Sequence, residues 1–193
     1  MGHMIRLNVL GLERLSANTH GEIVFSLRQT MGPLVQEAGK TLSITRGPHR
    51  GDLNLEFDSD TDTTSSMGIC KGGISLLGED AGEVVFVRAT KELRVCGPQR
   101  DPRKFLTASW LLGPALANTG IHELGHFIAN LEHVNDSMNF MSTMGPPQEG
   151  RTIATQREFW AGRKTFTPAQ KERLIARFKD EQWQGGMVVT PGP

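Results

Sequence analysis

The segment His-Glu-Leu-Gly-His at positions 122–126 constrains this chain more than any other feature. It lies in a stretch whose apolar residues recur at helical spacing, which predicts a helix. Residues four apart on a helix lie one turn apart on the same face, so His122 and His126 can reach a single metal ion. Glu123 points about 100° away, where its carboxylate can hold a metal-bound water without binding the metal. Neutral imidazoles suit Zn²⁺, so the motif predicts a zinc site.

The expected start of this helix follows from a proline. Pro114 suits the first residue of a helix, where its missing N–H is no loss. We expect the helix to run from Pro114 to about Ala129, after a separate helical stretch over residues 104–112.

A catalytic zinc ion needs a third protein ligand, and His133 is the candidate. In a continuous helix, His133 would lie about 10 Å beyond His126, too far for one ion. The chain must therefore turn back, and Asn130 is suited to the turn because asparagine tolerates the left-handed conformation. Three carboxylates remain as alternative third ligands: Glu132, Glu149 and Glu158.

Residues 122–133, read as H-E-L-G-H-F-I-A-N-L-E-H, resemble the zinc signature of the metzincin metallopeptidases. That signature is His-Glu-x-x-His-x-x-Gly-x-x-His or a final Asp, and a methionine turn follows it. Residues 134–141 resemble the approach to that turn, which makes Met141 its candidate methionine and an apolar floor of the site. The chain differs by one extra residue before His133 and by Asn130 in place of glycine. The resemblance identifies no subfamily.

The resemblance implies a zinc-dependent endopeptidase in which Glu123 acts first as general base and then as general acid on a metal-bound water. It implies a peptide or protein substrate and a secreted or periplasmic location. Two other functions stay open: a zinc hydrolase acting on cell-wall peptide amides, and a non-catalytic or latent zinc-binding domain. The chain contains no tyrosine, a residue that some metzincins place just after the methionine turn.

Periodicity and turn residues predict an α/β fold, and the resemblance implies that this fold is of the α+β zincin-like kind. We expect a twisted mixed sheet of about five strands backed by helices, then the active-site helix, then an irregular C-terminal subdomain that ends in a helix. The predicted strands are 5–10, 42–45, 53–57, 68–77 and 83–88. The predicted flanking helices are 22–38, with a kink or a restart at Gly32-Pro33, and a C-terminal helix capped by Thr167-Pro168.

The length of 193 residues predicts a single domain over 1–193. Within it we expect an N-terminal subdomain over about 5–130, a C-terminal subdomain over about 131–182, and a flexible tail over 183–193. Residues 1–4 read as a cloning scar.

Charge and hydropathy exclude two classes of partner. Lys and Arg balance Asp and Glu at 21 each, so no net charge attracts nucleic acid or anionic lipid. No apolar run approaches the roughly 18 residues of a membrane span. We expect a monomer that binds neither nucleic acid nor membrane.

Weaker signals concern the surroundings of the zinc site. Asp58, Asp60 and Asp62 alternate as in a calcium loop, yet Thr63 and Ile69 break the EF-hand pattern, which leaves a different calcium site or a solvated loop. Cys70 and Cys96 could form a disulfide or stay reduced, and the sequence around Cys96 faintly resembles a metzincin cysteine switch.

The substrate would pair with an exposed edge strand, either 68–77 or 83–88. Residues 144–163 would form the pocket wall, with Phe159 and Trp160 as its lining or as core.

Overall fold

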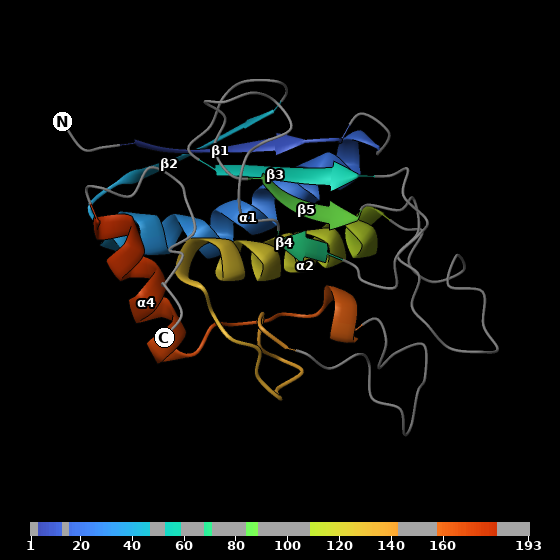
Figure 1. Cartoon of the computed structure of the whole chain (residues 1–193). Helices are drawn as coiled ribbons and strands as arrows, with labels where there is room; N and C mark the ends of the chain where they lie inside the picture. Colours follow the sequence, from blue (N-terminus) through green and yellow to red (C-terminus); the bar gives the residue numbers. More distant parts are fainter. Residues whose placement is uncertain are drawn as a thin grey trace.

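The structure is a computed structural model that describes residues 4–12, 16–46, 53–58, 68–70, 84–88, 109–142 and 158–180. Its described strands form one sheet in the order β2-β1-β3-β5-β4. β2, β1, β3 and β5 run parallel, and β4 is antiparallel to β5. Helices α1 and α2 lie side by side against one face of this sheet, and α4 packs against both helices (Figure 1). The expected mixed sheet backed by helices is therefore present.

The strands are β1 (Met4–Leu10), β2 (Thr41–Arg46), β3 (Leu53–Asp58), β4 (Gly68–Cys70) and β5 (Val84–Arg88). In β1 the alternating residues Ile5, Leu7 and Val9 are buried, as expected for a strand with one face on the core. β2 and β3 are not neighbours, because β1 lies between them and pairs with both. The chain therefore crosses over between β2 and β3 in a parallel arrangement and does not form a hairpin there.

Helix α1 (Ala17–Glu37) begins five residues before the predicted start at Glu22. Ser16 is its N-cap, and the Ser16 hydroxyl accepts a hydrogen bond from the Thr19 N–H at 3.2 Å. Pro33 lies inside the helix. Gly39, with a φ of +77°, takes the left-handed conformation that turns the chain toward β2.

Helix α2 (Ser109–Ala129) corrects the prediction that a new helix starts at Pro114. Pro114 lies in the second turn of one continuous helix, where its missing N–H removes a single hydrogen bond. Buried residues along its length, among them Leu116, Ile121, Leu124 and Phe127, join the hydrophobic core beneath the sheet. The core therefore holds the helix despite the proline.

Helix α4 (Pro168–Lys179) follows the predicted start. Thr167 caps it: the Thr167 hydroxyl accepts from the Gln170 N–H, and the Gln170 side chain accepts from the Thr167 N–H. Leu174, Ile175 and Phe178 are buried in the core.

Several predictions concern residues that the structure does not describe. These residues include the acidic loop after Asp58, Cys96, Glu149, most of the expected pocket wall, and the tail. Among the described helices, none is both long enough and apolar enough to cross a membrane.

Candidate metal centre

Helix α2 presents His122 and His126 one turn apart, and backbone carbonyls orient both rings. Nδ1 of His122 lies 2.7 Å from the Phe140 carbonyl oxygen, and Nδ1 of His126 lies 2.7 Å from that of Leu131. A carbonyl only accepts hydrogen bonds, so each Nδ1 carries the proton and each Nε2 keeps its lone pair. This is the tautomer and the outer hydrogen bond that metal-binding histidines use.

The chain turns back directly after α2. Asn130 has a φ of +46°, and it is the one non-glycine residue with positive φ in the part of the chain that the structure describes. The Asn130 N–H donates to the His126 carbonyl at 2.8 Å, and the Leu131 N–H donates to the Gly125 carbonyl at 3.2 Å. The left-handed residue therefore closes the helix and absorbs the extra residue of the motif, so that His133 returns to the helix face.

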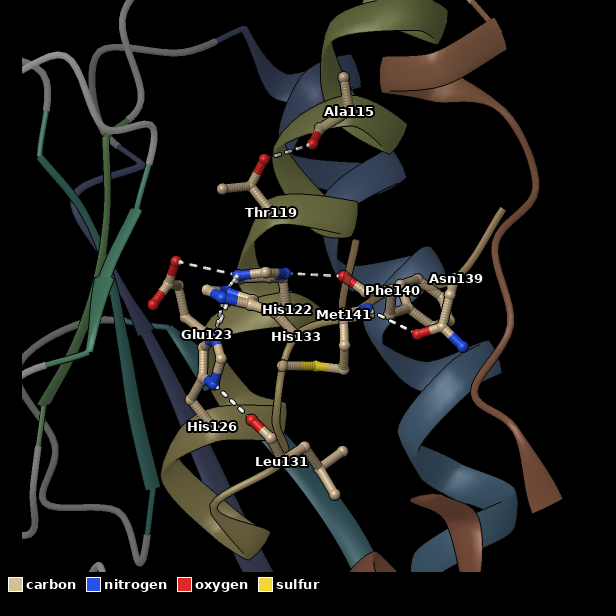
Figure 2. A network of polar contacts seen from close by, with 10 residues as sticks. All are labelled: Ala115, Thr119, His122, Glu123, His126, Leu131, His133, Asn139, Phe140 and Met141. Carbon is tan, nitrogen blue, oxygen red and sulfur yellow. Dashed lines mark hydrogen bonds and ion pairs between the residues drawn. The ribbon is translucent and has the colours of Figure 1, made fainter. Parts of the chain in front are cut away.

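The Nε2 atoms of the three histidines converge on one point (Figure 2). His126 Nε2 lies 3.1 Å from His122 Nε2 and 2.9 Å from His133 Nε2, and the third separation is 3.3 Å. His122 and His126 bring only lone pairs to this point, which repel one another unless a cation lies between them. Three imidazole nitrogens at such spacing fit the donor set of a zinc ion.

Among the alternative ligands, the two that the structure describes do not join this cluster. The three histidines are the single group of potential metal ligands among the residues that the structure describes, so no calcium site is indicated there. Glu132 and Glu158 are exposed outside the cluster, and Glu149 lies beyond the described residues.

Glu123 lies beside the histidines, buried against the sheet side of α2. Its Oε1 is 4.0 Å from His122 Nε2, and only 5% of the residue is exposed. Burial raises the pKa of Glu123 to about 7. A carboxylate with this pKa can both take up and release a proton near neutral pH.

Burial also keeps the imidazoles neutral. It lowers the pKa of His122 to about 4, against the opposing effect of the Phe140 carbonyl, and the nearby His126, His133 and Lys164 lower it further. Burial likewise lowers the pKa of His126, although the Leu131 carbonyl opposes the shift. Neutral imidazole is the form that binds metal, so both rings are in that form at pH 7.

Met141 lies under the helix between the two histidines. Its side chain is fully buried, and a Cβ placed on Gly125 would lie only 2.5 Å from the Met141 Sδ. The Met141 N–H donates to the Asn139 side chain at 2.8 Å, and Asn139 in turn donates to Gln170 of α4 at 3.0 Å. The thioether therefore occupies the space that the missing side chain of Gly125 leaves free.

Phe159 is buried, and Trp160 is partly buried against the core. The Phe159 ring meets that of Trp160 edge to face at 4.9 Å. Neither lines the cavity of about 660 Å³ that α1, α2 and residues 161–166 enclose, and that cavity contains none of the three histidines. Most of the expected pocket wall, residues 143–157, lies outside the described chain.

Sequence analysis missed three side chains of α4 that reach this site: Gln170, Arg173 and Arg177. Gln170 holds Asn139, and the two arginines donate to carbonyls at the end of α2. Their spacing of three and four residues was visible in the sequence, but their targets lie more than 30 residues away along the chain.

No protein-family model matches the sequence, and no curated protein matches it significantly. Among solved structures, the crystal structure of archaemetzincin from Methanopyrus kandleri is similar, with a TM-score of 0.52 at 15% sequence identity. The match covers 92% of this chain and 97% of that chain. The chain therefore has the fold of a metzincin, which confirms the resemblance read from residues 122–141 at the level of the fold. Its three histidines are consistent with a zinc site of the His-Glu-x-x-His type.

Proposed function

We propose that this protein is a zinc-dependent endopeptidase. The observation that carries the proposal is the convergence of three histidine Nε2 atoms, 2.9–3.3 Å apart, beside a buried carboxylate. His122, His126 and His133 would hold the zinc ion. The similarity of the fold to that of archaemetzincin supports this interpretation.

Zinc, when bound, would lower the pKa of a water and polarise the carbonyl of the scissile bond. The protein supplies the proton transfers. The Glu123 carboxylate would accept a proton from the attacking water and deliver it to the leaving amine, and its raised pKa of about 7 suits both steps. Phe140 and Leu131 would keep the rings of His122 and His126 oriented through their carbonyls.

The substrate would bind as an extended peptide along β4. β4 is the last strand of the described sheet next to β5, and an edge strand offers unpaired N–H and C=O groups to an added strand. The alternative edge, residues 83–88, is wrong, because β5 lies inside the sheet between β3 and β4. A single chain supplies all three histidines and Glu123, so we propose that the active form is a monomer.

Replacing Glu123 separates catalysis from metal binding. Glu123→Ala should retain zinc and lower kcat/KM by about 10²–10⁴-fold, the usual contribution of a general base. His122→Ala is the matched control, and it should lose both zinc and activity. Cleavage of a peptide library and zinc content by mass spectrometry are the measurements.

Three results would contradict the proposal. Unchanged hydrolysis by Glu123→Ala would remove Glu123 as the base. A parent protein that binds zinc but cleaves no peptide would favour the non-catalytic or latent domain. Release of peptidoglycan fragments without cleavage of linear peptides would favour the cell-wall hydrolase.

A further inference from the structure

Helix α4 carries a row of polar side chains that reaches two parts of the candidate metal centre: the turn at the end of α2 and the methionine turn. Gln170, Arg173 and Arg177 are three and four residues apart, so they lie on one face of the helix. Gln170 holds the methionine turn through Asn139. The two arginines reach the opposite side of the site, where α2 ends and the chain turns toward His133.

The arginines bind carbonyls that a helix end leaves without partners. Nη2 of Arg173 donates to the Ala129 carbonyl at 2.9 Å and to the Asn130 carbonyl at 3.0 Å. Nε of Arg177 donates to the Ile128 carbonyl at 3.2 Å. The last carbonyls of a helix lack intrahelical donors and form the negative end of its dipole, so cations are favoured there.

With the bonds from Arg173, both peptide groups that flank Asn130 have a hydrogen-bond partner for their N–H and for their C=O. In the Ala129–Asn130 peptide, the N–H donates to the His126 carbonyl and the C=O accepts from Arg173. In the Asn130–Leu131 peptide, the N–H donates to the Gly125 carbonyl and the C=O accepts from Arg173. Both peptide planes are therefore held at both ends, which defines φ and ψ at the left-handed residue.

His133 depends on this turn more than the other two histidines do. His122 and His126 are half-buried on α2, whereas the side chain of His133 is exposed and follows the turn by three residues. On its other side the His133 backbone is held by the Val134 N–H, which donates to the Met141 carbonyl at 2.9 Å. The turn at Asn130 therefore sets the direction from which the chain reaches His133. The motif has one extra residue between His126 and His133. The turn at Asn130 therefore has to return the chain to the other two histidines.

We propose that Arg173 is a positioning residue for His133: by holding both peptide groups at Asn130, it places the third ligand of the metal site. The proposal rests on the zinc site proposed above. It assigns Arg173 no contact with metal or substrate, so its effect should appear in metal affinity and coordination.

A double-mutant cycle tests the proposal, with zinc affinity measured by competition with a chelator. Arg173→Ala should raise the Kd for zinc by about tenfold, the lower end of the 10–100-fold loss that follows removal of a group bonded directly to a ligand, because Arg173 acts through the backbone of the turn. In the His133→Ala background the same replacement should change the Kd by less than about threefold, because the ligand that Arg173 positions is gone. Lys171→Ala removes an exposed cation from the same helix and should leave zinc affinity unchanged.

Two further measurements keep the test decisive if Arg173→Ala does not fold. Arg173→Lys keeps the positive charge but loses the planar fork, so its zinc affinity should lie between those of the parent and Arg173→Ala. The visible absorption of the Co²⁺-loaded protein reports coordination directly. Arg173→Lys should shift that spectrum toward the spectrum of His133→Ala.

The outcomes separate this proposal from the proposed function. If His133→Ala leaves zinc affinity unchanged, the three-histidine site itself is wrong. If His133→Ala weakens zinc binding but the Arg173 variants bind as the parent does, only the positioning role is overturned. An equal loss in both backgrounds would also overturn it, because Arg173 would then support the fold without acting through His133.

Discussion

The two halves of the metal centre are built in different ways. In α2, the positions of His122, Glu123 and His126 follow from helical geometry within five consecutive residues. In the loop over 130–142, the backbone around His133 and Met141 is held by hydrogen bonds from α4 and within the loop. Arg173 binds the turn at Asn130, Gln170 binds Asn139, and the Val134 N–H donates to the Met141 carbonyl at 2.9 Å. The helical half is therefore locally determined, whereas the loop half depends on contacts with α4. We therefore expect the loop half to be the more sensitive to distant substitutions.

The largest expected effect concerns the ligand in the loop. His133→Ala should weaken zinc binding by more than the roughly 100-fold seen when an outer-shell partner is lost, because it removes a ligand itself. Glu132→Ala, its exposed neighbour, should bind zinc as the parent does. Metal content and chelator competition measure both. A zinc loss in Glu132→Ala alone would show that the loop presents the carboxylate and not the imidazole.

The contact between the two halves gives the next effect. Gly125→Ala would place a Cβ 2.5 Å from the Met141 Sδ, and this overpacking should cost about 1–3 kcal/mol of the free energy of unfolding. Gly21→Ala is the matched control, since a Cβ there meets nothing within 4 Å in the interior of α1. It should stabilise the protein by about 0.5–1 kcal/mol. Denaturant unfolding measures both, and stabilisation by Gly125→Ala would disprove the tight packing of Met141.

The smallest expected effect is on stability, and it concerns Asn130, where α2 meets the loop. Asn130→Ala should cost about 1–2 kcal/mol, because alanine is strained at a φ of +46°. Asn130→Gly should be close to neutral, because glycine adopts positive φ without strain. Thermal unfolding of the two variants checks the prediction. Equal stability of Asn130→Ala and the parent would mean that the turn can form without a left-handed residue.

Local patterns predicted much of the fold. The alternation in β1, the cap at Thr167 and the apolar spacing of α2 are read within a few residues, and the structure contains all three elements. Pro114 misled the prediction of the start of α2, because a proline in the second turn costs one hydrogen bond and core packing offsets it. The start of α1 was placed too late, since its first turn carries few of the apolar residues that periodicity detects.

Long-range contacts decided what local patterns left open. A strand's propensity does not say which strands pair with it, so β5 could not be recognised as an inner strand before the sheet order was known. The sequence favoured core over pocket lining for Phe159 and Trp160, and packing shows Phe159 buried and Trp160 packed, partly buried, against the core.

Local sequence alone places His122 and His126 on one face of a helix, because residues four apart lie one helical turn apart whatever surrounds them. It also marked the residue at which the chain could turn, because asparagine tolerates positive φ. The folded chain brings His133 into the cluster, packs Met141 beside Gly125, and places Arg173 on the turn at Asn130. The physical reason is range: helical spacing acts over a few residues, whereas Arg173 and the carbonyl of Asn130 meet only after the chain has folded.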